Sequence, residues 1–486
     1  MAEPIPVLKN YINGQWVASA ATEFGEIHNP ATGELLARVP LSPPVEVDAA
    51  AQAAKTAFWS WRSTPPLKRA RQLMKLKDLL LQHYDEIAVT LTNEHGKIKA
   101  EAGMELQRAI ENIEVASGAP SLMMGHNLED VAGGIDEYAI RQPVGVFASL
   151  NPFNFPAMIP FWSLPYAVAC GDCQIVKPSP RVAMTQAKIF ELIDQAGFPP
   201  GVLNLVHGGA DAANALMAHP AICGISFVGS TPVGRHVYET SAKYGKRVQV
   251  QAGAKNWGVV MPDANLEKSV ENIIASAYDC TGQRCLALAG ILCVGDTYNK
   301  LKPLLKDGIA RRKIGYGLDD QVAMGPIISP EAQQRVADFV DSGLQDGAGL
   351  LVDGRDVHVK GYPKGYWVGH YVFEDVTPKM RIAREEIFGP VLCMIPVKSF
   401  DEAMQVIHNS PFGNAANLYT TSGATARRFK YEARCGNLGI NIGVPAPMAM
   451  FHFAGTKQSF FGDLHAQGRD AFKFFTEETI VIERWF

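Results

Sequence analysis

The chain has 486 residues, of which 47% are hydrophobic and 19% are charged, and its formal net charge is -4 at pH 7. This length exceeds what one hydrophobic core usually organises, so we expect two or three lobes. The charge balance argues against a polybasic nucleic-acid surface. The most apolar stretch, residues 157–170, is interrupted by two prolines and is too short to span a bilayer.

Cellular location is inferred from the N-terminus and the cysteines. The first residues lack the basic and apolar regions of a signal peptide. Eight cysteines in a long chain without such a signal indicate reduced thiols rather than disulfides. We therefore expect a cytoplasmic protein with neither nucleic acid nor a membrane as partner.

The first part of the chain has a helical pattern. Residues 45–58 and 67–81 carry apolar positions at helical spacing, with charges on the opposite face. Residues 128–141 then alternate around Gly133 and Gly134, which predicts a β-hairpin.

Strand and helix patterns alternate from residue 140 to residue 234. Strands are expected at 144–150, 174–177, 202–206 and 224–228, with helices at 184–196 and 212–218. This order predicts right-handed crossovers and a parallel, doubly wound sheet. Cys170 and Cys173 have C-x-x-C spacing, but without a second pair they are better explained as buried thiols than as a redox or metal site.

A second alternating region follows, with expected strands at 258–261, 289–294 and 391–397, and a terminal strand at 474–485. The fold class is therefore α/β, with two doubly wound lobes and a small β hairpin and tail. Exposed strand edges are usually covered by another subunit, so we expect a homo-oligomer, either a dimer or a tetramer. The expected domains are a dinucleotide-binding domain (1–122 and 144–250), a catalytic domain (251–455) and oligomerisation segments (123–143 and 456–486).

Three loops at the ends of predicted parallel strands are candidates for cofactor binding. They are residues 151–156 (NPFNFP), 177–180 (KPSP) and 227–234 (FVGSTPVG). Open α/β sheets bind ligands at this edge. Gly229 permits close approach of the backbone, and Ser230 begins a helix whose free N–H groups suit a pyrophosphate. The glycine-rich dinucleotide fingerprint and a metalloprotease zinc motif are both missing, and we expect no metal.

Four segments together resemble the aldehyde dehydrogenase superfamily. They are residues 151–156, 227–230 (FVGS), 282–285 (GQRC) and 385–390 (EEIFGP), in matching order over nearly the whole chain. Residues 119–125 (APSLMMG), 253–256 (GAKN), 443–448 (GVPAPM) and 459–465 (SFFGDLH) are similar to the CoA-acylating methylmalonate-semialdehyde dehydrogenases.

The resemblance implies roles for residues of the reaction centre. Cys285 corresponds to the nucleophile, which attacks an aldehyde and holds the product as a thioester. Asn154 corresponds to the side-chain donor to the oxyanion. Gln251 occupies the position of the usual glutamate base, and an amide has no useful basicity near neutral pH. A thiol such as coenzyme A, already partly ionised, needs less help as the final acceptor than water does.

The resemblance also implies an NAD site. The cofactor-binding residues expected from it are Asn151, Phe153, Lys177, Arg181, Gly229, Ser230, Glu386 and Phe388. Glu386 and Phe388 correspond to the pair that positions the nicotinamide ribose, and Lys177 to the residue that binds the adenine-side ribose. Many NAD-preferring relatives carry Glu three residues after this lysine, where the present chain has Pro180 followed by Arg181. NAD is expected, although Arg181 could favour a 2'-phosphate.

Two arginines indicate an acidic substrate. Arg284 adjoins the nucleophile, and Arg108 matches the other substrate-side arginine of the resembling subfamily. A guanidinium pairs with a carboxylate through two hydrogen bonds. Phe161, Trp162 and Phe451 are candidate pocket walls.

The expected reaction is oxidation of methylmalonate or malonate semialdehyde to propionyl-CoA or acetyl-CoA, with decarboxylation. One alternative is a hydrolytic NAD(P)-dependent aldehyde dehydrogenase, in which Glu386 or another acid activates water. A second alternative is a non-catalytic binding protein on the same fold.

Overall fold

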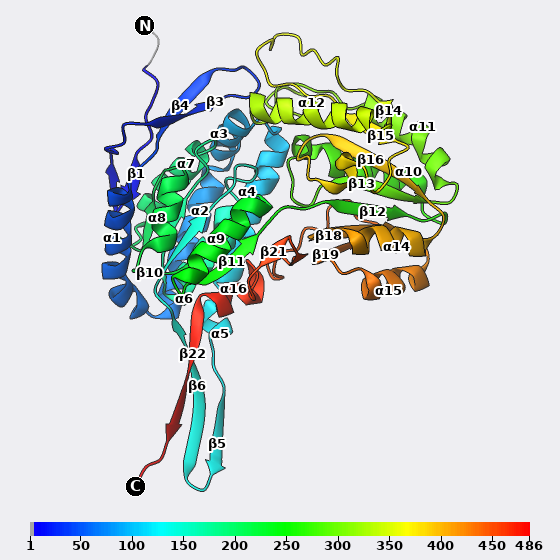
Figure 1. The fold of residues 1–486 in the computed structure, drawn as a ribbon. Helices are drawn as coiled ribbons and strands as arrows, with labels where there is room; N and C mark the ends of the chain where they lie inside the picture. The colour runs from blue at the N-terminus through cyan, green and yellow to red at the C-terminus, as the bar shows by residue number, and fades with distance from the viewer. Residues whose placement is uncertain (1–3) are drawn as a thin grey trace.

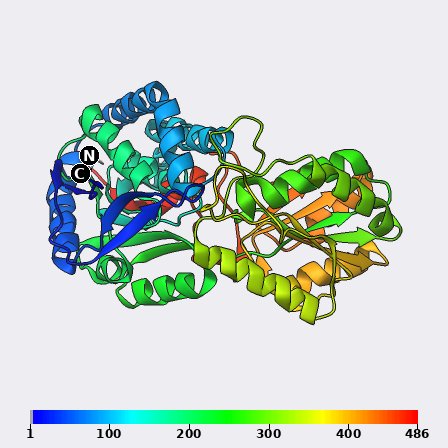
Figure 2. The same cartoon turned by 90° about the horizontal axis from the view of Figure 1, so that it is seen from above.

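Two sheets, each with a parallel centre, lie in separate lobes in a computed structural model that describes residues 4–486 (Figures 1 and 2). The first sheet has the strand order β2-β1-β9-β8-β7-β10-β11-β21. Its bounds are β1 Asn10–Ile12, β2 Gln15–Val17, β7 Val146–Leu150, β8 Cys173–Lys177, β9 Leu203–Leu205, β10 Ile222–Val228, β11 Arg247–Gln251 and β21 Phe460–Phe461. The five strands from β9 to β11 are parallel.

The strand order of the first sheet changes direction between β7 and β10, which makes this point a topological switch point. From β7 the chain adds β8 and β9 on one side, and it then returns to add β10 and β11 on the other. Open α/β sheets bind ligands at the carboxyl ends of the strands at such a switch point. Residues 151–156 and 229–234 follow these two strands, so the fold places two of the candidate loops there.

The second sheet has the order β14-β15-β16-β13-β12-β18-β19. Its strands are β12 Asn256–Val260, β13 Leu288–Val294, β14 Gly349–Val352, β15 Tyr371–Glu374, β16 Val391–Val397, β18 Ala415–Tyr419 and β19 Asn437–Ile440. All neighbours except β14 and β15 are parallel. Along β13, Leu292 packs in one hydrophobic cluster and its neighbour Cys293 in another, so both faces are covered.

Helices surround both sheets. The first lobe holds α1 Pro44–Arg62, α2 Pro66–Gln82, α3 Tyr84–His95, α4 Lys99–Ala116, α5 Ala119–Leu122, α6 Leu164–Cys170, α7 Met184–Ala196, α8 Ala210–Ala218, α9 Thr231–Lys243 and α16 Gly468–Phe474. The second holds α10 Leu266–Tyr278, α11 Thr297–Ala310, α12 Pro330–Gln345, α13 Arg381–Arg384, α14 Phe400–Asn409 and α15 Gly423–Glu432. Within residues 4–486, none of these helices is both long and apolar enough to cross a membrane. The expected α/β class with two lobes is confirmed.

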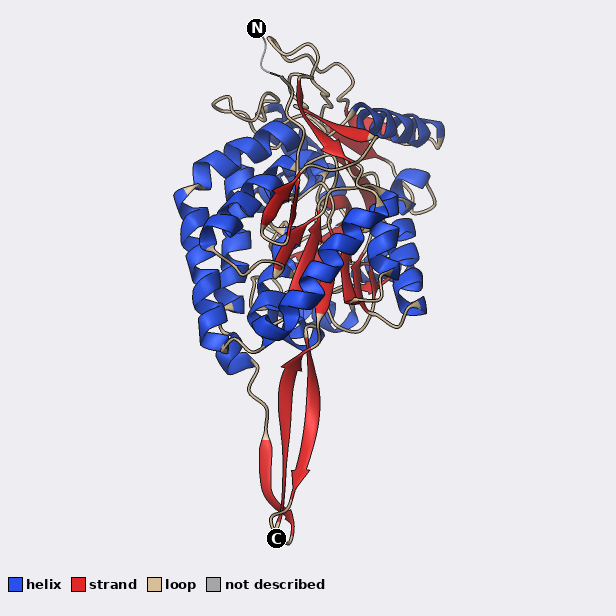
Figure 3. Ribbon diagram, turned by 90° about the vertical axis from the view of Figure 1, so that its left-hand side faces the viewer, coloured by secondary structure: helices blue, strands red, loops and turns tan. Residues whose placement is uncertain are grey.

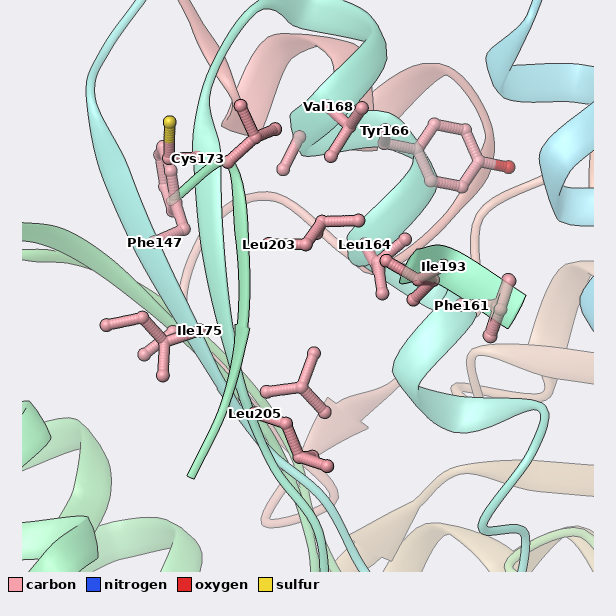
Figure 4. Close-up of a cluster of buried hydrophobic side chains, with 14 of the residues drawn as sticks. Phe147, Phe161, Leu164, Tyr166, Val168, Cys173, Ile175, Ile193, Leu203 and Leu205 are labelled. Atoms are coloured by element: carbon pink, nitrogen blue, oxygen red, sulfur yellow. The ribbon is translucent and has the colours of Figure 1, made fainter. Parts of the chain in front are cut away.

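Figure 4 shows the part of the first lobe's core that lies between its sheet and α6 and α7, and α1, α2 and α4 also contribute buried side chains to this core. Phe147, Ile175 and Leu205 come from three adjacent parallel strands and are fully or almost fully buried. Cys170 and Cys173 also lie in this core, and burial raises the pKa of both thiols. All eight cysteines of the chain are unpaired, as expected.

A three-stranded antiparallel sheet projects from the first lobe (Figure 3). It consists of β5 Asn127–Ala132, β6 Ile135–Pro143 and β22 Thr476–Glu483, and β22 pairs with β6 along its whole length. The predicted hairpin and terminal strand are therefore present. Residues 456–474 lie elsewhere: β21 pairs with β11, and α16 packs against α4 and α6.

Two further antiparallel pairs complete the strands. After β2, β3 Phe24–His28 and β4 Leu35–Pro40 form a hairpin of their own, and β17 Phe412–Gly413 pairs with β20 Thr456–Lys457.

Candidate active site

Cys285 lies in a loop between a short 3-10 helix, Asp279–Gly282, and β13. The loop is built on a left-handed turn, because Cys280, Thr281 and Gly282 have φ values of 52°, 56° and 68°. A side chain at Gly282 would place its Cβ 2.2 Å from the carbonyl oxygen of Gly389. The turn is held by side chains, since Thr281 Oγ1 donates to the Gly325 carbonyl at 3.0 Å. The nucleophile loop is therefore a fixed and locally strained structure.

The backbone of Cys285 is anchored by two amides. Its carbonyl oxygen accepts hydrogen bonds from Asn256 Nδ2 and Asn414 Nδ2, both at 2.8 Å.

Burial and the charge of Glu386 raise the pKa of the Cys285 thiol to about 12, although nearby backbone N–H groups and Arg284 act in the opposite direction. Cysteine reacts as the thiolate, so the resting site holds an unactivated nucleophile.

Asn154 meets the nucleophile loop directly. It follows β7 in the first lobe, its residue is 3% exposed, and its Nδ2 donates to the backbone carbonyl of Gln283 at 3.0 Å. This contact brings the two lobes together two residues before Cys285. The amide nitrogen carries a second hydrogen, which is free to serve another acceptor in the site.

A buried ion pair that the sequence analysis missed supports the Asn154 loop. Lys97 Nζ lies 2.6 Å from Glu105 Oε2 and donates to the Asn154 carbonyl at 2.7 Å. Glu105 Oε1 accepts from the backbone N–H groups of Ala157 and Met158 at 2.7 and 3.1 Å. Both charged side chains are 0% exposed. Lys97 follows the glycine that ends α3, and only the tertiary fold reveals its contacts.

Gln251 ends β11 and is 3% exposed. Its Nε2 donates to the Phe453 carbonyl at 3.2 Å, and its Oε1 has no hydrogen-bond partner among residues 4–486. The side chain therefore offers a buried acceptor but no group that ionises near neutral pH.

A cavity of about 350 Å³ opens beside Cys285. Its lining includes Arg108, Arg284, Phe155, Trp162 and Phe453. Two of the proposed walls are wrong in position: Phe161 is completely buried in the core of the first lobe, and Phe451 is 68% exposed. Trp162 does line the cavity, where its ring stacks on Phe453 with centroids 4.6 Å apart.

The two arginines of the cavity differ in their carboxylate partners and in their exposure to solvent. Arg284 Nη2 lies 3.8 Å from Asp279 Oδ2 and 4.0 Å from Glu101 Oε1, and these carboxylates help to raise its pKa against the opposing effect of burial. Arg108 Nη1 pairs at 2.8 Å with Glu111 Oε2, and its side chain is 36% exposed. The cavity thus holds a largely buried guanidinium next to the thiol, Arg284, and a more exposed one, Arg108, which already pairs with Glu111.

Glu386 occupies the opposite side of the Cys285 loop, and both residues line one small pocket. Its Oε1 accepts from the backbone N–H of Ala254 at 3.0 Å, and burial raises the pKa of its carboxyl group to about 7. Phe388 has a left-handed backbone, with φ of 58°, and its ring meets the edge of Phe153 at 5.8 Å between centroids.

A separate cleft of about 570 Å³ lies at the carboxyl ends of β7, β8 and β10. Asn151, Lys177 and Pro180 line it, together with residues of α8 and α9. Lys177 Nζ donates to the Pro178 and Gly208 carbonyls at 3.1 and 3.0 Å, and burial lowers its pKa to about 8. An ammonium group has three donors, so one remains for a ligand hydroxyl.

The structure places the other expected cofactor residues unequally. Ser230 is exposed at the N-cap of α9, and the Gly229 N–H donates to the Gln251 carbonyl at 3.1 Å. Arg181 is exposed and pairs with Glu331 of α12 at 3.2 Å, and it does not contribute to the lining of the cleft. The suggestion that Arg181 favours a 2'-phosphate therefore gains no support from its position.

The structure thus has two α/β lobes, a partly buried cysteine beside a reaction cavity where the lobes meet, and a separate cleft for a nucleotide-type ligand at the switch point of the first sheet. The sequence profile of the aldehyde dehydrogenase family matches residues 16–481, and the chain belongs to that family. The superfamily resemblance drawn from the motifs is confirmed, and the alternative of a non-catalytic protein is set aside.

The similarity extends over the full length of named relatives. The chain is 46% identical over 486 residues to malonate-semialdehyde dehydrogenase 2 of Geobacillus kaustophilus (strain HTA426), covering 100% of both. It is 46% identical over 478 residues to the malonate-semialdehyde dehydrogenase of Halalkalibacterium halodurans, covering 98% of both.

Solved structures agree with these relatives. Methylmalonate-semialdehyde dehydrogenase from Oceanimonas doudoroffii superposes with a TM-score of 0.97 at 41% identity, covering 99% of each chain. The NAD+ complex of an aldehyde dehydrogenase from Bacillus cereus superposes with a TM-score of 0.93 at 30% identity, covering 98% of this chain and 96% of that one.

Proposed function

We propose that the protein oxidises malonate semialdehyde or methylmalonate semialdehyde with NAD and transfers the decarboxylated acyl group to coenzyme A, giving acetyl-CoA or propionyl-CoA. The observation that carries this proposal is that Cys285 opens on a cavity that holds Arg108 and Arg284, while the residue hydrogen-bonded to the carbonyl of Phe453 in the wall of that cavity is the neutral Gln251. The named substrates of the full-length relatives support the same choice.

The first half of the cycle forms a thioester on Cys285. The thiolate adds to the aldehyde carbon, and the resulting oxyanion accepts hydrogen bonds from Asn154 Nδ2 and the backbone N–H of Cys285. Arg284, buried beside the thiol, pairs with the substrate carboxylate, and Arg108 approaches it from the outer side of the cavity. These contacts fix the aldehyde carbon near the sulfur.

The residues present fit NAD. Lys177 has a free donor at the cleft for a ribose hydroxyl, and Gly229 and Ser230 immediately precede α9, whose N-terminus suits a pyrophosphate. Asn151 and Phe153 belong to the loop after β7, and Glu386 and Phe388 lie beyond Cys285 on the nicotinamide side. When bound, NAD accepts the hydride that the thiohemiacetal carbon loses.

The second half of the cycle releases the acyl group. Loss of the β-carboxylate as carbon dioxide leaves an enolate of the thioester, which takes up a proton. The thiolate of coenzyme A then attacks the carbonyl, and the electron pair of the broken bond returns to Cys285 sulfur. Gln251 contributes no base, so water attack stays slow and the thioester persists for the thiol.

The hydrolytic alternative depends on Glu386. Its carboxyl group has a pKa of about 7 and shares a pocket with Cys285, so it is the acid placed to activate water if hydrolysis occurs. Its Oε1 is, however, committed to the Ala254 N–H.

The deciding experiment is rapid mixing of enzyme, NAD and malonate semialdehyde, with and without CoA, followed by the mass of the product. We expect one burst of NADH without CoA and sustained turnover to acetyl-CoA with it. Gln251→Glu should increase CoA-independent release of free acid, and Gln251→Asn should not. Equal turnover of the wild type without CoA would refute the proposal.

The projecting sheet supports a homo-oligomer, dimer or tetramer. Leu128, Ile480 and Ile482 on it are 63%, 53% and 66% exposed, and such apolar edges are usually covered by another subunit. Light scattering after size exclusion tests this, because a monomer at micromolar concentration would contradict it. Eight unpaired cysteines support the cytoplasm as the proposed location.

A further inference from the structure

Two histidines and an aspartate converge behind the wall of the Cys285 cavity. His452 adjoins Phe453, which lines that cavity, and Asp470 lies in the first turn of α16. His465 is part of the loop that joins β21 to α16. Within residues 4–486, this is the only group of three side chains of metal-ligand type whose ligand atoms all lie within 4.8 Å of one another.

The distances suit coordination better than hydrogen bonding. Asp470 Oδ2 lies 3.5 Å from His452 Nδ1 and 3.4 Å from His465 Nδ1. A charge-assisted hydrogen bond would be about 2.7–2.9 Å long. Ligand atoms about 2.0–2.1 Å from one tetrahedral zinc ion lie about 3.3 Å apart, which is close to both values.

The tautomer of His465 strengthens this reading. Its Nε2 lies 3.2 Å from the Gly455 carbonyl oxygen, which can only accept, so Nε2 carries the proton. In the neutral ring, Nδ1 then directs its lone pair toward the Asp470 carboxylate. In that tautomer, Nδ1 of His465 and Oδ2 of Asp470 can both direct a lone pair at one cation.

The rings are also held in position. His465 stacks on Phe460 with centroids 3.9 Å apart, and on its other neighbour, His452, with centroids 4.9 Å apart. A backbone carbonyl that fixes the tautomer of a ligating histidine is the usual arrangement around protein-bound zinc. The His452 side chain is 44% exposed, which leaves an approach from solvent.

We propose that His452, His465 and Asp470 form a three-ligand site for a divalent transition cation of the zinc class, with its remaining position open to water. Two nitrogen ligands and one carboxylate suit this class rather than calcium or magnesium. The cation would link α16, through Asp470, to the segment that contains His452 and Phe453. The carbonyl of Phe453 accepts the hydrogen bond from Gln251, so the cation would also stabilise the position of Gln251. The proposal does not depend on which aldehyde is oxidised.

The test is titration of untagged protein with Co²⁺ and Zn²⁺, using the visible spectrum of cobalt and calorimetry for zinc. Cys285 is first blocked with iodoacetamide, so that the nucleophile cannot bind metal. We expect one equivalent with a cobalt spectrum that lacks thiolate charge transfer, and a rise in Tm with zinc. His452→Gln and Asp470→Asn should each weaken binding at least tenfold, and the exposed control His358→Gln should not.

Folding of each variant is checked by its Tm without metal and by its affinity for NAD. A variant that binds NAD normally but loses the cobalt spectrum supports the site. Unchanged cobalt binding in both His452→Gln and Asp470→Asn, a thiolate band in the spectrum, or binding only at millimolar metal would each overturn the proposal.

Discussion

Lys97→Met tests whether the buried ion pair positions the oxyanion loop. The change removes the ammonium group that lies 2.6 Å from Glu105 and donates to the Asn154 carbonyl. Breaking a buried pair by deleting one partner typically costs about 3–5 kcal/mol. Glu105 keeps two backbone donors, so we expect about 3 kcal/mol here. Burial already raises the pKa of Glu105, and loss of Lys97 raises it further.

Loss of the Lys97–Glu105 ion pair should also slow the oxidation step. Misplacement of a catalytic group by about 1 Å costs about 10²-fold in rate, so the NADH burst of Lys97→Met should slow by about 10- to 100-fold. NAD affinity should change less than the burst rate, because Lys97 contacts the loop at Asn154 and does not line the switch-point cleft. The assays are a stopped-flow NADH burst and thermal unfolding.

A second variant separates charge burial from lost packing. In Lys97→Met with Glu105→Gln, no uncompensated charge remains and the amide oxygen still accepts from the loop, so stability should recover by about 2 kcal/mol. The matched control is Lys188→Met, which removes a partly exposed pair with Glu86 and should cost at most about 1 kcal/mol. A burst within twofold of wild type in Lys97→Met, with unchanged Tm, would refute the positioning role.

Three further changes probe the site. Asn154→Ala should slow the NADH burst by about 10²–10³-fold, the usual effect of losing one oxyanion donor, while iodoacetamide inactivation of Cys285 stays unchanged; an equal fall in both would indicate a disrupted loop. In the cofactor-free enzyme, the rate of inactivation by iodoacetamide should keep rising with pH beyond pH 9, because the pKa of the Cys285 thiol is raised to about 12. Glu386→Gln removes a negative charge and should move this pH profile to lower pH. A plateau near neutral pH in the wild type would contradict the raised pKa of Cys285. Arg284→Gln should raise KM for malonate semialdehyde by about 10- to 100-fold, since charged hydrogen bonds are worth about 1.5–3 kcal/mol, and leave propanal oxidation within a few-fold; Arg108→Gln should have a smaller effect because that guanidinium already pairs with Glu111.

Elements with strong periodicity and clear ends were predictable from the sequence. The helix expected at 184–196 is α7, and the strand expected at 391–397 is β16. The β3–β4 hairpin was not predicted. It is an antiparallel pair outside both main sheets, and a charge on β4, Arg38, is exposed. Residues 456–474 join the first lobe through two-residue strand pairing, which no sequence pattern specifies.

The candidate site divides in the same way. Cys285, Asn154 and Glu386 occur in recognisable motifs, and the structure brings all three to one place, although their catalytic roles stay predictions. Lys97 and Glu105 belong to no recognisable motif. Lys97 contacts Asn154, 57 residues later in the chain, and Glu105 contacts Ala157, 52 residues later, so only the folded chain reveals what they do. Phe451 was chosen as a wall where Phe453 lies, because nothing in a loop sequence sets which aromatic side chain points inward.

The protonation of the centre explains why the absence of a base at residue 251 is tolerable. In the resting site the thiol of Cys285 has a pKa of about 12 and the carboxyl group of Glu386 a pKa of about 7, so the proton stays on sulfur. A glutamate at position 251 would add another negative charge and raise the thiol pKa further unless it were protonated. Gln251 avoids that cost, and Arg284 acts in the favourable direction. In the proposed mechanism, the same neutral side chain that gives water no base would also ease formation of the thiolate, so acylation and transfer to a thiol would both benefit from it.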